Sequence, residues 1–136
     1  MHILIVEDNE GDQLLLREAF KKGGPNIRLT FASTVEEGQT ALKGENFNLI
    51  LLDLNLPGKN GKDFLKEFRG DYVYRRIPVV VLTNSIAEKD ITECYALGAS
   101  GYLTNPSSFD DLEQVVQALC QFWGKEVFAQ AQYSGH

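Results

Sequence analysis

Short apolar runs alternate with stretches of helical periodicity along the sequence. The runs cover residues 2–6, 27–32, 48–53, 78–82 and 101–103. Four of them are nearly continuous in Ile, Leu and Val, which is typical of strands that are buried on both faces. The fifth run is short and carries a tyrosine, which suits an edge strand. This alternation predicts an α/β fold in which helices cover both faces of a doubly wound parallel sheet.

Five segments with helical spacing separate and follow these runs. They cover residues 11–22, 34–43, 61–69, 87–97 and about 108–123. Thr34 and Glu37 have the spacing of a capping box, and glycines follow several of the segments, as expected at helix ends. In the last segment, apolar residues recur every three or four positions from Phe109 to Trp123. We therefore expect this helix to pack one face against the sheet.

Length and composition limit the possible functions. The 136 residues suffice for one globular domain, which we place at 1–123, with a C-terminal tail or helix extension at 124–136. The net charge is −6 and no basic stripe is present, so direct binding to nucleic acid is not expected. No secretory signal or membrane-spanning run occurs. Cys94 and Cys120 lack zinc-site or disulfide spacing, so we expect a cytoplasmic protein with reduced thiols.

Polar residues follow four of the five predicted strands, and ligands of doubly wound sheets bind beyond these carboxyl ends. If the first and third strands are neighbours, Glu7, Asp8 and Asp53 meet in one shallow pocket. Two like charges about 4 Å apart repel by about 4 kcal/mol at an effective dielectric constant of about 20, so a cation is needed. Oxygen ligands without His or Cys favour a hard cation such as Mg²⁺.

This set of residues is suited to phosphoryl transfer. A metal beside Asp53 would neutralise developing charge, and the carboxylate could act as a nucleophile that forms an aspartyl phosphate. The Thr83 hydroxyl and backbone amides could hold the other phosphoryl oxygens. Taken singly, Asp8 and Asp53 are explained equally well as turn or capping residues, and Thr83 as a turn hydroxyl. Their joint placement at one sheet edge favours a functional site.

Four motifs, IVEDN at 5–9, LLDLNLPGKNG at 51–61, VVVLTNS at 79–85 and GASGYLTNP at 98–106, resemble the response-regulator receiver family. The resemblance covers residues 2–123 and implies a flavodoxin-like sheet of five parallel strands in order 2-1-3-4-5, flanked by five helices. It implies that a sensor histidine kinase or phosphotransfer protein donates a phosphoryl group to Asp53. It further implies that Mg²⁺ is held by Glu7, Asp8, Asp53 and the carbonyl of Asn55.

The resemblance also implies a switch. Thr83 would move toward the phosphoryl group and Tyr102 would follow it inward, which changes the face formed by the fourth helix, the fifth strand and the fifth helix. Downstream proteins would read that face in a two-component phosphorelay. Taken alone, Tyr102 is equally well explained as an edge-strand aromatic. We expect no enzymatic activity beyond self-phosphorylation and self-dephosphorylation, and no output domain within this length.

One departure from the family pattern bears directly on this chemistry. The family usually reads YLTKP, and this chain reads YLTNP, so Asn105 stands where a lysine would reach the phosphoryl oxygens. A neutral hydrogen bond is about half as strong as a charge-assisted one. The domain could accept phosphate through its metal and couple it weakly to the switch. Alternatively, it could be a phosphate-independent interaction or dimerisation module. Lys59 could replace part of the missing charge, or be a solvated turn residue.

The segment after the first strand and the aromatic pair at the end of the last helix bear on function as well. A flavin-binding protein has the same architecture, but the segment EDNEGD after the first strand places carboxylates where a phosphate loop would be required. The pair Phe122 and Trp123 at the end of the last helix, together with the Glu7-Asp8 form of the acidic pair, resembles the stand-alone receivers that act with bacterial phytochrome kinases, which favours a homodimer. Packing of these aromatic residues against the domain's own sheet is the alternative.

Overall fold

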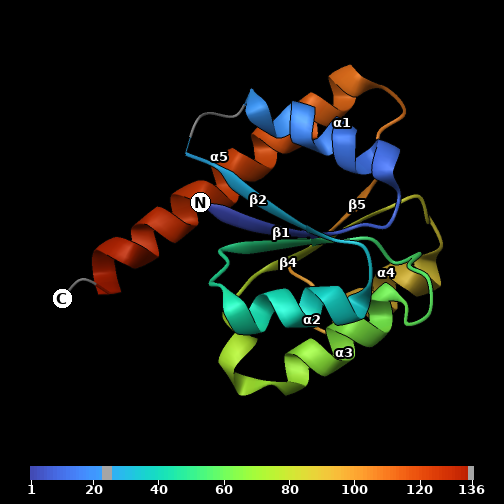
Figure 1. The fold of residues 1–136 in the computed structure, drawn as a ribbon, viewed down its shortest axis with the longest axis horizontal. Helices are drawn as coiled ribbons and strands as arrows, with labels where there is room; N and C mark the ends of the chain where they lie inside the picture. The colour runs from blue at the N-terminus through green and yellow to red at the C-terminus, as the bar shows by residue number, and fades with distance from the viewer. Residues whose placement is uncertain (23–25, 135–136) are drawn as a thin grey trace.

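A sheet of five parallel strands in the order β2-β1-β3-β4-β5 forms the centre of the molecule (Figure 1). The computed structural model describes residues 1–22 and 26–134. For residues 124–134 it describes the backbone but not the side chains. The order confirms the one implied by the family resemblance, and every strand end lies within one residue of its predicted place. The strands are β1 (His2–Val6), β2 (Arg28–Ala32), β3 (Leu49–Leu52), β4 (Val79–Thr83) and β5 (Gly101–Thr104).

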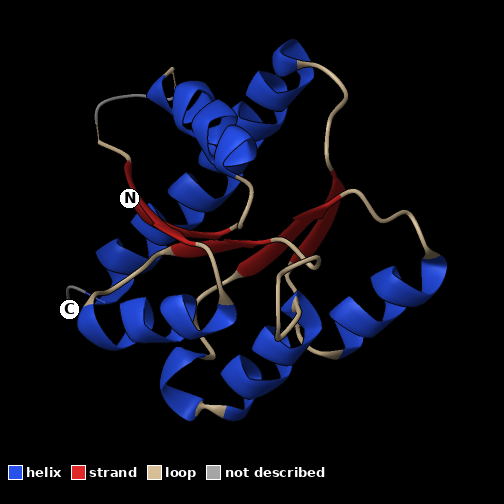
Figure 2. Cartoon of the chain, turned by 45° about the vertical axis from the view of Figure 1, so that its right-hand side comes forward, coloured by secondary structure: helices blue, strands red, loops and turns tan. Residues whose placement is uncertain are grey.

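Helices cover both faces of this sheet, as Figure 2 shows. They are α1 (Glu10–Lys21), α2 (Val35–Gly44), α3 (Gly61–Gly70), α4 (Glu88–Ala96) and α5 (Phe109–Ser134), with a short 3₁₀ helix, η1 (Tyr72–Tyr74). The α5 helix runs on past residue 123 and extends beyond the sheet in Figure 1. The Gly-Gly-Pro stretch at 23–25, which follows the first predicted helix, lies outside the described residues. Within the described part of the chain, no helix combines the length and apolarity needed to cross a membrane.

Two hydrophobic layers sandwich the sheet, because successive side chains of a strand point to opposite faces. In β1, Leu4 and Val6 pack in the layer that includes α2 and α3, whereas Ile3 and Ile5 pack in the layer that includes α1 and α5. The strands β3 and β4 alternate in the same way. All of these strand residues are buried. This two-sided burial explains why the strands read as continuous apolar runs in the sequence.

Local side-chain contacts set where the helices begin. Asn9 caps the N-terminus of α1, and its side chain accepts a hydrogen bond from the backbone N–H of Asp12 at 2.8 Å. Thr34 caps α2 as predicted, accepting a hydrogen bond from the N–H of Glu37 at 3.1 Å. The Glu37 carboxylate accepts its own hydrogen bond from the N–H of Ser33 rather than from that of Thr34. With Asn9 as its cap, α1 begins at Glu10, one residue earlier than the apolar pattern of the sequence indicated.

The turn between β3 and α3 holds Asp53 in a tightly packed backbone. The N–H of Gly61 donates to the carbonyl of Leu54 at 3.0 Å. A Cβ at Gly61 would lie 2.5 Å from the carbonyl oxygen of Asp53 and 2.8 Å from the Cα of Leu54. Both distances are far below van der Waals contact, so only glycine fits here without moving the backbone. The identity of this one residue therefore helps to set the position of Asp53.

Replacement of Gly61 by alanine should displace this turn and destabilise the fold. We expect Gly61→Ala to lower the free energy of unfolding by about 1–3 kcal/mol, as overpacking does in tight sites. Gly70→Ala is the matched control at the other end of α3, because a Cβ there meets no atom within 4 Å. Urea unfolding of the two variants checks this, and equal stabilities would contradict it.

Candidate functional site

Three carboxylates meet at the carboxyl ends of β1 and β3, which pair side by side in the sheet. The N–H of Glu7 donates to the carbonyl of Ala32 at 2.9 Å, and the N–H of Asp53 donates to that of Val6 at 3.0 Å. These bonds fix the residue that follows each strand. One carboxylate oxygen from each of Glu7, Asp8 and Asp53 lies within 4.8 Å of the other two. The structure thus places these predicted site residues together.

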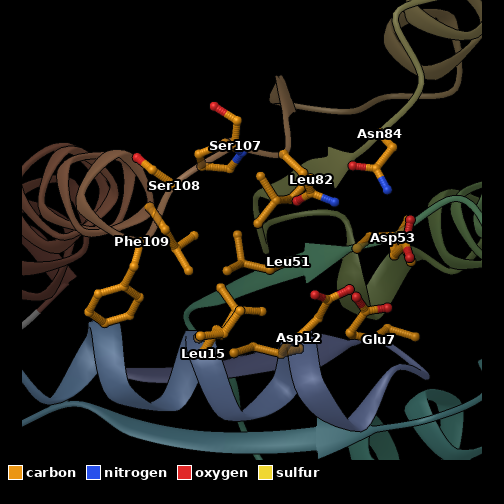
Figure 3. A pocket seen from close by; sticks show the side chains of 17 residues that line it. Glu7, Asp12, Leu15, Leu51, Asp53, Leu82, Asn84, Ser107, Ser108 and Phe109 are labelled. Carbon is orange, nitrogen blue, oxygen red and sulfur yellow. The ribbon is translucent and has the colours of Figure 1, made fainter.

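Glu7 is the buried member of this acidic cluster, with 6% of its surface exposed. Its Oε2 atom has no hydrogen-bond partner among the described residues. Burial is the main reason that the pKa of Glu7 rises to about 9, and the nearby carboxylates of Asp53 and Asp12 raise it further. Figure 3 shows the side chains of Glu7, Asp12 and Asp53 close together. The site therefore holds excess negative charge around a buried carboxyl group.

Asp12 was missed at the sequence level. It lies in the first turn of α1 and contributes a carboxylate beside Glu7. The signal was available, because a helix that begins directly after β1 must place its first turn over the same edge of the sheet. The pattern of residues 11–22 predicts the helix but not the role of Asp12.

The donor set fits a divalent metal ion. Its donors are carboxylate oxygens, which hard cations such as Mg²⁺ and Mn²⁺ prefer. Glu7, Asp8 and Asp53 could each supply one oxygen, and the buried Oε2 of Glu7 lacks any other partner within the described structure. The backbone of Asn55 also lies here, since its N–H donates to Oδ1 of Asp53 at 3.2 Å.

Thr83 and Tyr102 lie on the neighbouring strands. Thr83 ends β4, which pairs with β3, and its side chain is fully buried. Its hydroxyl has no hydrogen-bond partner in the described part of the chain. The Tyr102 hydroxyl donates to the backbone carbonyl of Ser85 at 2.9 Å, and burial raises the pKa of the Tyr102 phenol. The loop between β4 and α4 is therefore tied to β5 through a tyrosine.

Asn105 lines the same cavity as Asp53, and its backbone N–H donates to the carbonyl of Thr83 at 2.8 Å. The sequence left two interpretations of Lys59 open, a partial substitute for the missing lysine charge and a solvated turn residue. The Lys59 ammonium group lies 2.8 Å from the carboxylate of Glu67 on α3. This ion pair gives no support to a role for Lys59 at the Asp53 carboxylate.

An ion-pair network that sequence reasoning did not predict connects α3 to α4. The Lys62 ammonium lies 2.5 Å from Asp90 and 2.6 Å from Glu93. Asp90 also accepts a hydrogen bond from the Ser85 hydroxyl at 2.5 Å. The same Ser85 accepts the Tyr102 hydrogen bond on its carbonyl. The loop that follows Thr83 is therefore bonded directly to α4 and β5, and Lys62 connects that part of α4 to α3. The spacing of Asp90 and Glu93 on one helix face was the signal available in the sequence.

The metal-free protein should lose stability as pH rises. The folded chain keeps the Glu7 proton up to about pH 9, whereas the unfolded chain releases it near the usual pKa of 4.5. The folded state then binds more protons between these values, so the free energy of unfolding falls over this range. Urea unfolding with a chelator at several pH values measures this slope. Asp12→Asn should reduce it and Glu7→Gln should remove it. Glu10→Gln, a control at an exposed position, should leave it unchanged; an unchanged slope in Glu7→Gln would refute the assignment.

Comparisons with known proteins point in one direction. Residues 3–117 match the family model for the response regulator receiver domain. The response regulator Rcp1 of Synechocystis is 38% identical over 131 residues, covering 89% of this chain and 87% of that protein. The probable methanogenesis regulatory protein FilR2 of Methanothrix harundinacea is 33% identical, covering 89% of this chain and 82% of that protein.

Solved structures agree with this match. The phosphorylated cyanobacterial phytochrome response regulator RcpA superposes with a TM-score of 0.82 and 36% identity, covering 90% of this chain and 92% of that one. The Mn²⁺-bound form of Rcp1 gives a TM-score of 0.81 and 36% identity, covering 90% of this chain and 93% of that one. Similarity in sequence and in backbone arrangement thus extends along most of the chain.

Proposed function

Because this chain belongs to the response-regulator receiver family of two-component systems, we propose that it accepts a phosphoryl group from a histidine kinase or phosphotransfer protein on Asp53. The observation that supports this most is the gathering of Glu7, Asp8 and Asp53 within 4.8 Å at one sheet edge. The proposed output is contact with other proteins in the cytoplasm, and the free thiols Cys94 and Cys120 are compatible with that location.

The proposed metal ion is Mg²⁺, held by Glu7, Asp8, Asp53 and the carbonyl of Asn55. The buried Oε2 of Glu7, which has no hydrogen-bond partner in the described part of the chain, supports this assignment. The similar protein Rcp1 has a Mn²⁺-bound form, which supports a divalent ion here as well. When bound, the ion would offset the negative charge that develops on the transferred phosphoryl group.

The chain's own residues supply the rest of the reaction. A carboxylate oxygen of Asp53 attacks phosphorus, while the bond from phosphorus to the donor's histidine nitrogen breaks and the nitrogen keeps the electron pair. The hydroxyl of Thr83 has no partner among the described residues, so it is available to donate a hydrogen bond to a phosphoryl oxygen. Movement of Thr83 would then change the conformation of the loop after β4, in which the carbonyl of Ser85 accepts the Tyr102 hydrogen bond. Hydrolysis of the product would be the only further activity.

Phosphorylation of Asp53 can be tested with a small phosphodonor and Mg²⁺. Intact-mass spectrometry should detect the addition of one phosphoryl group to the chain, because Asp53 is the proposed nucleophile. The adduct should be lost in Asp53→Asn and in the presence of a chelator. Asp63→Asn is the control, since this exposed aspartate caps α3 and lies outside the acidic cluster. An adduct that persists in Asp53→Asn, or none at all, would refute the proposal.

A second candidate function is a phosphate-independent interaction module. Asn105 supports it, because a neutral amide lines the cavity beside Asp53 and the nearby Lys59 pairs with Glu67. This candidate requires equal partner affinity in the wild type, Asp53→Asn and Asp53→Glu. A change in affinity upon phosphorylation favours the first function instead.

We also propose that the receiver domain ends near residue 123 and that the chain forms a homodimer, either through the face of α4, β5 and α5 or through the C-terminal segment of α5. Phe122 is 61% exposed and packs edge-to-face against Trp123, with ring centroids 4.6 Å apart. An exposed aromatic residue of this kind is typical of interface anchors. The side chains of 124–134 and residues 135–136 lie outside the described structure.

Phe122→Ser should weaken this dimer. Removal of the ring takes away apolar area that a partner would bury, and we expect at least about a tenfold rise in the dimer dissociation constant. Analytical ultracentrifugation over a concentration series measures it. Leu14→Ser is the control, as Leu14 is similarly exposed (58%) but lies on α1. Equal constants for the two variants would contradict the assignment to α5.

A further inference from the structure

A cavity of about 210 Å³ lies beside Asp53, between α1 and the loop that joins β5 to α5. Its two ends differ in chemistry (Figure 3). Glu7, Asp12 and Asp53 form an acidic end, and Leu15 and Phe109 lie at the apolar end. Leu15 is 46% exposed, so the apolar end opens to solvent. The volume is below the roughly 300 Å³ at which pockets for drug-sized ligands begin, and suits a single side chain.

No lysine or arginine is among the described residues that line this cavity. The amides of Asn84 and Asn105 are neutral. Two lysines in the segment after β3 are already paired, Lys59 with Glu67 and Lys62 with Asp90. The described neighbours of Asp53 therefore supply acidic groups without a cationic side chain.

Phosphorylation would increase this imbalance. A phosphoryl group carries about −1.5 to −2 charges at neutral pH. The carboxylate of Asp8 lies close to that of Asp53, and the carboxylate of Asp12 lies beside Glu7, so one divalent ion would offset only part of the total negative charge. A second cation that reached the acidic end from the cavity would stabilise the charge on the phosphoryl oxygens through charge-assisted hydrogen bonds.

We infer that this cavity binds a lysine or arginine side chain supplied by the protein that exchanges the phosphoryl group with Asp53. The alkyl stem would pack against Leu15 and Phe109, and the cationic group would extend to Asp53. Long basic side chains combine an apolar stem with a charged tip, which matches the two ends of the cavity. The inference rests on the proposed phosphorylation of Asp53, but the binding of the cation can be measured without it.

Binding is tested on the unphosphorylated, Mg²⁺-loaded chain with two probes. Nα-acetyl-lysine methylamide carries the cation, and Nα-acetyl-norleucine methylamide has the same stem without it. We expect saturable amide NMR shifts at Leu15, Asn105 and Phe109 with the lysine probe, with a dissociation constant on the order of millimolar. The norleucine probe should bind at least about tenfold more weakly.

Variants locate the binding. Leu15→Phe should fill the cavity and abolish the shifts, whereas Leu14→Phe, at the adjacent exposed position on α1, should preserve them. Asn105→Lys should also abolish them, because it supplies the cation within the chain. Shifts confined to the acidic cluster, equal binding of both probes, or no saturable shift would each overturn the inference. Binding of n-butylammonium but not of the lysine probe would also overturn it, since the ligand would then be a free amine.

A second measurement concerns the reaction itself. The initial rate of phosphorylation by a small donor should rise about tenfold with saturating lysine probe, which corresponds to one charge-assisted hydrogen bond in the transition state. Asn105→Lys should show the raised rate without probe and no further response. Probe binding without any metal-dependent adduct would refute the proposed function alone. An adduct whose rate ignores the bound probe would refute only the inferred role of the cation.

Discussion

The pairing of β1 with β3 is the constraint on which the site depends. These strands are separated by more than forty residues in sequence, yet their hydrogen bonds bring the residues after Val6 and Leu52 to one edge. Strand pairing and the two apolar layers that bury it supply the favourable free energy, and the acidic cluster opposes it through repulsion and desolvation. The raised pKa of Glu7 is the direct expression of that conflict.

The sequence alone was sufficient to predict the strands, the two-layer packing and the meeting of Glu7, Asp8 and Asp53. The strands and the two-layer packing follow from periodicity, and the meeting of the three carboxylates follows from the rule that parallel strands end at one edge once the first and third strands are taken as neighbours. The strand order came from the family resemblance, since periodicity does not specify which strands are neighbours. Asp12 and the Lys62 network were not predicted, because they depend on how helices are rotated and placed over the sheet. That placement is decided by tertiary packing.

The loop after Thr83 is where the proposed signal would leave the site. Ser85 joins it to β5 through the Tyr102 hydroxyl and to α4 through Asp90, and Lys62 connects Asp90 to α3. These contacts involve a hydroxyl, a carbonyl and partly exposed ions, which are individually weak compared with core packing. The free energy of one hydrogen bond gained or lost at Thr83 is therefore comparable with the free energy of the contacts that hold the loop.

The close approach of Gly61 to the carbonyl of Asp53 has a mechanical consequence. The backbone of Asp53, the proposed phosphoryl acceptor, is packed so closely against Gly61 at the start of α3 that no Cβ fits between them. On the neighbouring strand β4, the terminal residue Thr83 has a hydroxyl with no bond to lose within the described structure. Structural adjustment to a group added at Asp53 would then fall on the end of β4 while the Asp53 backbone stays in place.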